Sequence, residues 1–131
     1  MHHRISVCTS CRPKGQQEKL GLGFIEDLRA ELAARGASLS QTYKVGGVAC
    51  MAGCDNPCTV AFHASDKATY LFGDIEGEGD LASLADFAAL YAELHDGWCS
   101  SVDRPAGLRK KTLARVPASL YALSNSGGEI P

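Results

Sequence analysis

Hydrophobic positions along the chain predict four β-strands. Apolar and polar residues alternate over residues 4–7, and more weakly over residues 39–45. Two β-rich runs at residues 58–64 and 68–72 are joined by three turn-forming residues, 65–67, which is typical of a β-hairpin. We therefore expect two separate strands followed by a hairpin.

Two longer segments have the periodicity of amphipathic helices. In the first, over about 23–35, Phe24, Leu28 and Leu32 recur every four residues, and a glycine at 36 marks its end. The second runs from Asp80, a plausible N-terminal cap, to Leu94. After a proline at 105, residues 106–116 could form a short basic helix that ends before another proline.

The order strand, helix, strand, hairpin, helix favours a parallel crossover extended by antiparallel strands. This is the layout of a small thioredoxin-like α/β domain with a mixed four-stranded sheet, two main helices and a short C-terminal basic helix. We expect one domain over residues 1–131, with its core at 4–117 and a flexible tail at 118–131.

Composition narrows the class of protein. The chain has 131 residues, 45% of them hydrophobic, and a formal net charge of −2, so nothing suggests nucleic acid or a membrane surface as a partner. No targeting segment is visible, and no stretch approaches the roughly 18 apolar residues of a membrane helix. The expected location is the cytoplasm.

The cysteines carry the strongest functional signal. Five of the six fall in two tight groups, Cys8 and Cys11, then Cys50, Cys54 and Cys58, both in loops at strand ends. In a reducing cytoplasm closely spaced thiols are more often metal ligands than disulfides, and four thiolates hold an iron–sulfur cluster. We predict that Cys8, Cys11, Cys50 and Cys54 ligate such a cluster. Cys58 either packs inward as a small hydrophobe or replaces Cys11.

Alternatives to an iron–sulfur cluster stay open at this point. A [4Fe–4S] cluster is an alternative to [2Fe–2S], and four cysteines at these spacings would also suit zinc or cobalt. A redox-active dithiol is less favoured, because Pro13 and Gly15 follow Cys11 where a helix should begin. Structural disulfides are the least favoured alternative.

Other chemically interesting residues give weaker signals. His2 and His3 should be solvated at the chain start, whereas His63 is expected in a strand and His95 at the end of a helix. None of the four histidines has the sequence spacing to the cysteines that a shared metal site would need. Cys99 is expected to be a buried thiol or a dimer contact. The basic stretch 104–115 is either a solvated helix face or a docking surface for an acidic redox partner.

Two runs of sequence resemble a known family. VACMAGCDNPCTVAF at 48–62 and TYLFGDI at 69–75 are similar to the thioredoxin-like [2Fe–2S] ferredoxins. Over residues 4–117 the chain more closely resembles an uncharacterised bacterial family of predicted metal-binding proteins often found beside cobalamin-biosynthesis genes. The motifs that carry this resemblance are VCTSCR at 7–12, CMAGCDNPCTVAF at 50–62, YLFGD at 70–74 and RPAGLRKKTLARVP at 104–117.

The resemblance implies a function and a ligand set. Cys8 would match the first ligand of the ferredoxins, and Cys50 and Cys54 the last two. The second ligand departs from the ferredoxin pattern, because residues 18–24 contain no cysteine. Cys11 is its nearest substitute. The resemblance implies an electron carrier and not an enzyme, a larger oxidoreductase as redox partner, a role in cobalamin synthesis and a homodimer.

Overall fold

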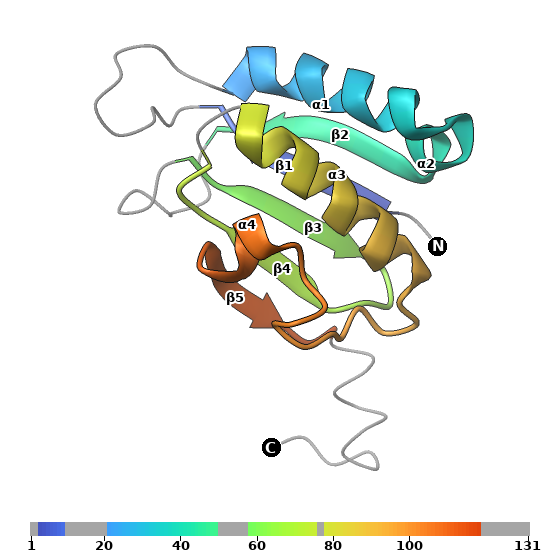
Figure 1. Ribbon diagram of the computed structural model, residues 1–131, viewed down its shortest axis with the longest axis vertical. Helices are drawn as coiled ribbons and strands as arrows, with labels where there is room; N and C mark the ends of the chain where they lie inside the picture. Colours follow the sequence, from blue (N-terminus) through green and yellow to red (C-terminus); the bar gives the residue numbers. More distant parts are fainter. Residues whose placement is uncertain (1–2, 10–20, 50–57, 76–77, 119–131) are drawn as a thin grey trace.

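The computed structural model describes residues 3–9, 21–49, 58–75 and 78–118, except for the side chains of residues 21, 22 and 78. Within these ranges the chain forms a mixed α/β structure (Figure 1). The elements are β1 (His3–Cys8), α1 (Gly21–Arg35), α2 (Ala37–Thr42), β2 (Tyr43–Val48), β3 (Val60–Ala64), β4 (Thr69–Phe72), α3 (Glu78–Glu93), α4 (Ala106–Arg109) and β5 (Thr112–Val116). The expected C-terminal tail lies mostly outside the described residues.

The strands form one mixed sheet in the order β2-β1-β3-β4-β5. β1 and β2 are parallel and are connected through α1, which confirms the predicted crossover. The other neighbouring pairs are antiparallel, and β3 and β4 form the predicted hairpin. The sheet has five strands, so the predicted count of four is wrong.

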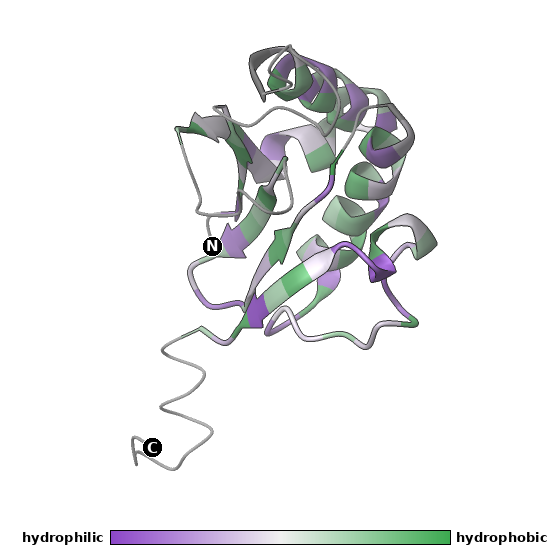
Figure 2. Ribbon diagram, turned by 90° about the vertical axis from the view of Figure 1, so that its left-hand side faces the viewer, coloured by the Kyte–Doolittle hydropathy of each residue, from purple (hydrophilic) through white to green (hydrophobic). Residues whose placement is uncertain are grey.

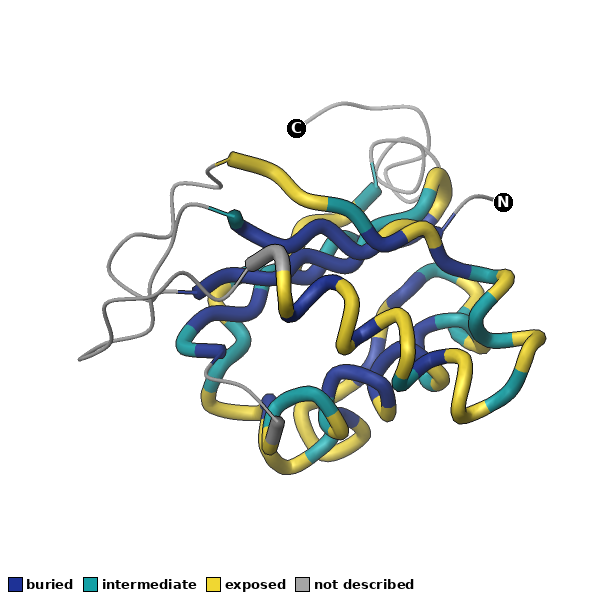
Figure 3. The backbone as a smooth tube through the Cα atoms, turned by 90° about the horizontal axis from the view of Figure 1, so that it is seen from above, coloured by how far each residue is buried: buried dark blue, intermediate teal, exposed yellow. Residues whose placement is uncertain are grey.

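The helices α1, α3 and α4 lie on the same face of the sheet (Figures 1 and 3). The α1 residues Phe24, Ile25, Leu28 and Leu32 are buried, as their spacing predicts. Hydrophobic and hydrophilic residues alternate around both long helices (Figure 2), as expected for helices with one buried side. No helix in the described part of the chain is long and apolar enough to cross a membrane.

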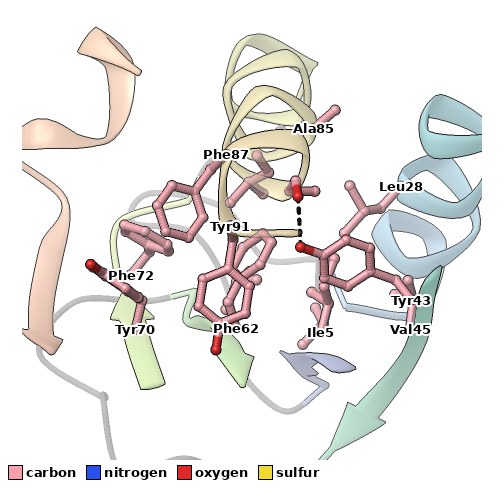
Figure 4. Packing of buried hydrophobic residues seen from close by; sticks show 14 of the residues in the cluster. Ile5, Leu28, Tyr43, Val45, Phe62, Tyr70, Phe72, Ala85, Phe87 and Tyr91 are labelled. Atoms are coloured by element: carbon pink, nitrogen blue, oxygen red, sulfur yellow. Dashed lines mark hydrogen bonds between the residues drawn. The ribbon is translucent and has the colours of Figure 1, made fainter. Parts of the chain in front are cut away.

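Aromatic side chains fill the space between α3 and the sheet (Figure 4). Phe62 of β3 lies at the centre, with edge-to-face contacts to Tyr43, Phe72, Phe87 and Tyr91. The Tyr43 hydroxyl donates a hydrogen bond of 2.7 Å to the carbonyl of Ala88, so this buried polar group is satisfied. These aromatic contacts therefore join β2, β3 and β4 to α3, and the buried residues of β1 and α1 belong to the same core.

The predicted strand over 39–45 is wrong at its start. Gly36, with φ of 140°, ends α1, and residues 37–42 then form the short helix α2 before β2 begins at Tyr43. None of the α2 residues is buried, so the weak alternation around Leu39 is not that of a sheet face.

The predicted basic helix over 106–116 is also largely wrong. Only α4 is helical there, and residues 112–116 pair with β4 as the edge strand β5. The predicted cap Asp80 lies inside α3 and does not begin it. Its carboxylate instead forms an ion pair of 2.8 Å with Lys111, which lies just before β5.

His3 and Lys67 are buried together, contrary to the expectation of a solvated His3. The Lys67 Nζ lies 2.9 Å from His3 Nε2 and donates to the carbonyls of Tyr91 and Ala92 at 2.6 and 3.2 Å. A lysine at a helix C-terminus interacts favourably with the helix dipole. The hairpin turn is thereby tied to the end of α3.

The stability of the protein should decrease in acid, because two histidines, His3 and His63, have lowered pKa values in the folded state. Burial, reinforced by the Lys67 ammonium, lowers the pKa of His3 below its ordinary 6.5, and burial, reinforced by Arg4, lowers the pKa of His63. Just below pH 6.5 the unfolded chain therefore binds more protons than the folded chain does. The contribution of the two neutral histidines to the free energy of unfolding is complete above that pH, and it is lost as the pH falls through the lowered pKa values. Urea denaturation at a series of pH values should show this loss, and His3→Gln should reduce its slope. An unchanged slope would exclude His3 as a source.

Candidate metal centre

The carboxyl ends of β1 and β2 lie side by side. Cys8, the last residue of β1, pairs with Val48, the last residue of β2. The Thr9 amide donates to the Val48 carbonyl at 2.8 Å, and the Cys8 Sγ lies 3.8 Å from the carbonyl oxygen of Ala49. Ala49 directly precedes Cys50 in the sequence. Cys8 of the first cysteine group thus contacts the residue that precedes the second group.

The start of β3 lies at the same edge of the sheet. The Cys8 amide donates to the Thr59 carbonyl at 3.0 Å, because β3 runs antiparallel to β1. Cys58 exchanges backbone hydrogen bonds with Ile75, at 3.5 and 3.1 Å, just beyond β4. Cys8 and Cys58 therefore lie on adjacent segments of the same sheet edge.

Both described thiols of this edge are removed from solvent. Cys8 and Cys58 each have 0% of their surface exposed. Burial without a compensating charge favours the neutral thiol, whereas a bound metal stabilises the thiolate. The burial of Cys58 is compatible both with inward packing and with ligation, so both alternatives stay open, and β3 itself begins two residues later at Val60.

Thr59 is a polar residue of this edge that the sequence did not single out. Continuing the β1–β3 register places Thr59 opposite Cys8, so the two side chains share one face of the sheet. The Thr59 hydroxyl is fully buried, and its oxygen has no hydrogen-bond partner among the described residues. An unpaired buried hydroxyl is unfavourable, and a sulfur-rich ion or cluster would give it an acceptor.

Gly47 lets β2 approach the end of β1. A Cβ at this position would lie 2.5 Å from Thr9 Cγ2 and 3.3 Å from Ile25 Cδ1. The glycine therefore allows Thr9 and α1 to pack directly on β2, which holds the neighbouring Cys8 in place.

The donors that are described fit a thiolate-ligated metal in type and in placement. Two buried thiols and an unpaired hydroxyl lie on neighbouring segments at one sheet edge, and Ala49, which Cys8 contacts, precedes Cys50 in the sequence. Within the described ranges no group of three or more His, Cys, Asp or Glu residues could hold a metal. Cys11, Cys50 and Cys54 lie outside the described residues, so their ligation stays a prediction.

His3, His63 and Cys99 lie away from this edge. His3 is at the other end of β1, and His63 Nε2 lies 3.0 Å from the Ser6 hydroxyl. Cys99 is buried, as expected, and its Sγ lies 3.4 Å from the hydroxyl of Tyr70. Burial and the neighbouring Cys99 raise the pKa of Tyr70, so the phenol stays protonated.

Comparison with solved structures gives similar folds. A thioredoxin-like [2Fe–2S] ferredoxin from Aquifex aeolicus aligns over 90% of this chain and 96% of its own, with a TM-score of 0.54 and 13% identity. A crystal structure of the wild-type ferredoxin from the same organism covers 86% of this chain and 97% of its own, with a TM-score of 0.53 and 13% identity. At this identity the similarity shows a thioredoxin-like fold, as predicted.

Comparison at the level of sequence identifies a family. A family model described as "Protein of unknown function (DUF1636)" matches residues 5–118. No curated protein matches the chain. The family description mentions neither a metal nor a gene context, so the predicted metal binding and the cobalamin link stay predictions.

Proposed function

This chain belongs to the DUF1636 family, and we propose that it is an iron–sulfur protein that carries single electrons on a [2Fe–2S] cluster. The observation that carries this proposal is the convergence of Cys8, Ala49 and Cys58 at one sheet edge. The thioredoxin-like fold adds support, because the structural neighbours with that fold are [2Fe–2S] ferredoxins.

Cys8, Cys50 and Cys54 would hold the cluster together with a fourth cysteine. Cys8 contacts the carbonyl of Ala49, and Ala49 directly precedes Cys50 in the sequence. The fourth ligand is Cys11, three residues after Cys8, or Cys58, which is buried at the same edge. The cluster would supply a one-electron redox couple.

The residues around the cysteines would adjust the properties of the site. The buried Thr59 hydroxyl can donate a hydrogen bond to a sulfur atom, and exclusion of water from Cys8 and Cys58 lowers the local dielectric constant. Hydrogen bonds to sulfur and solvent exposure are the main protein contributions to the reduction potential of such centres. We expect Thr59→Val to lower the potential of the cluster.

The proposed function also implies a partner enzyme and a location in the cell. An electron carrier needs a larger oxidoreductase as its partner, and the family resemblance suggests an enzyme of cobalamin synthesis in the cytoplasm. Pull-down experiments with oxidised and reduced protein would identify that enzyme, and gel filtration would test the expected homodimer.

Absorption spectroscopy of protein purified without oxygen tests the proposal directly. Visible absorption bands, with two irons and two sulfides per chain, are the expected result. A colourless protein with one zinc or cobalt would show a single-metal site. A metal-free protein that reduces disulfides would show a dithiol oxidoreductase. Either of the last two results would contradict the proposal.

Two neighbouring glycines provide a matched test of the packing at the site. Gly47→Ala should lower the cluster content per chain, because its Cβ would displace Thr9 and the adjacent end of β1. Gly46→Ala is the control, since no atom lies within 4 Å of the Cβ it would introduce. Iron and sulfide analysis of both variants measures the effect. Equal cluster contents would show that the close approach at Gly47 does not matter for the site.

A further inference from the structure

A cleft lined by arginines lies beside the edge strand β5. It has a volume of about 570 Å³ and is bordered by β5 and by the connection between α3 and α4. Three arginines, the indole of Trp98 and several hydroxyl groups line it, and the described lining residues include no aspartate or glutamate. The residues that matter for its chemistry are Trp98, Ser100, Arg104, Arg109, Thr112 and Arg115.

Two of the arginines are held in fixed positions. Arg109 donates from Nε to the Ser101 carbonyl at 2.9 Å and from Nη2 to the Val102 carbonyl at 2.8 Å. Arg115 donates from Nη1 to the Cys99 carbonyl at 2.7 Å, and its guanidinium stacks 3.9 Å from the centre of the Trp98 ring. Neither arginine forms an ion pair with a carboxylate of the described residues.

The third arginine, Arg104, is buried. Only 9% of its surface is exposed, and its guanidinium carbon lies 5.9 Å from the centre of the Tyr70 ring. Its Nε is buried and has no hydrogen-bond partner among the described residues. A buried charged group with an unused donor is unfavourable unless an anion pairs with it.

We propose that this cleft is a binding site for a small molecule that carries an oxyanionic group, a phosphate or a carboxylate. Guanidinium groups bind both anions through parallel hydrogen bonds. The arginines would provide the donors, because the Ser100 hydroxyl already donates to the Asp103 carboxylate at 3.0 Å and the Thr112 hydroxyl to the Leu108 carbonyl at 2.9 Å. The volume falls within the range of about 300 to 1,000 Å³ that is typical of small-molecule sites. An anion in the cleft would neutralise three clustered positive charges.

The site is separate from the proposed metal centre. β5 is three strands away from β1, which corresponds to about 14 Å across the sheet. The proposal therefore does not depend on the cluster. It also gives a role to part of the basic stretch, whereas Lys111 in the same stretch is paired with Asp80.

Trp98 is the only tryptophan of the chain, so its fluorescence reports on this cleft alone. The full-length protein is titrated in separate experiments with inorganic phosphate and with succinate, and with sodium chloride at matched ionic strength. Phosphate or succinate should produce a saturable fluorescence change and raise the unfolding temperature, because a ligand of the native state stabilises it. Sodium chloride should do neither. The stronger of the two anions identifies the ligand class.

Charge-matched variants locate the site. Arg109→Gln and Arg104→Gln should each weaken binding about tenfold or more, as expected for loss of a charged hydrogen bond. Lys110→Gln removes the same charge next to the cleft without lining it and should leave the affinity within about twofold. Arg109→Lys keeps the positive charge but loses the paired donors that hold the guanidinium on the Ser101 and Val102 carbonyls, so it should bind more weakly than the unsubstituted protein.

Three results would overturn the proposal. The first is no saturable response to either anion in either readout. The second is an equal loss of affinity in Lys110→Gln and Arg109→Gln, which would indicate general charge attraction. The third is a response to an acidic peptide such as polyglutamate without one to the small anions, which would make the cleft a protein-docking surface.

Discussion

Cys8→Ser is expected to yield protein that contains almost no iron and shows no visible absorption. Cys8 is the described thiol that connects all three converging segments, because it contacts Ala49 through Sγ and Thr59 through its amide. A serine hydroxyl is a harder and less acidic ligand than a thiol, so it replaces a cluster thiolate poorly. Iron and sulfide analysis of anaerobically purified protein measures the loss.

Cys99→Ser is the matched control for this experiment. Cys99 is also buried, but it lies beside the Tyr70 hydroxyl and not at the sheet edge that carries Cys8. This variant should retain the cluster. Full iron content in Cys8→Ser, or equal loss in both variants, would contradict the assignment of Cys8 as a ligand.

The same assay decides between Cys11 and Cys58 as the fourth ligand. If Cys11 ligates, Cys11→Ser should lose the cluster, and Cys58→Ser should keep it with some loss of stability, because Cys58 is fully buried. The opposite pattern would assign Cys58. If both single variants keep the full cluster, neither Cys11 nor Cys58 is required by itself as the fourth ligand.

Phe62→Ala should destabilise the protein more than any other single truncation in the aromatic core. The ring is fully buried and has edge-to-face contacts with four other aromatic rings. Truncation of a buried phenylalanine typically costs about 3–5 kcal/mol, against a total stability of about 5–15 kcal/mol for a domain. Urea denaturation followed by circular dichroism measures the change in the free energy of unfolding.

Phe62→Leu is the control, because it keeps most of the buried volume. It should cost roughly 1–2 kcal/mol, mainly through the lost ring contacts. Both variants should be compared at equal cluster content, since a bound cofactor also stabilises the native state. A cost of Phe62→Ala below that of Phe62→Leu would show that the aromatic cluster is not the centre of the core.

The sequence predicted the long helices and the central strands because their patterns are local. The four-residue spacing of Phe24, Leu28 and Leu32 specifies a buried helix face without knowledge of the sheet. The strand β5 was missed because its residues become a strand only by pairing with the free edge of β4. The helix α2 was missed because it buries no residue and thus leaves no hydrophobic pattern.

The sequence predicted that strand ends carrying cysteines converge, but it did not predict which side chains face one another there. Strand ends that carry cysteines were expected to converge, and Cys8 and Cys58 do lie at one sheet edge. The facing position of Thr59 depends on the strand register, which the sequence alone does not give. Likewise, a lysine in a predicted turn gives no sign that Lys67 is buried against His3 and the end of α3.

The position of β1 between a parallel and an antiparallel neighbour has a consequence for biosynthesis. Cys8 emerges from the ribosome before β2 and β3, and its contacts with both neighbours form only after these later segments pair with β1. Contacts between segments so far apart form slowly, so the nascent thiol is exposed to oxidants and stray metals during that interval. Slower translation after β3, or a chaperone that covers the first strand, should therefore increase the yield of correctly loaded protein.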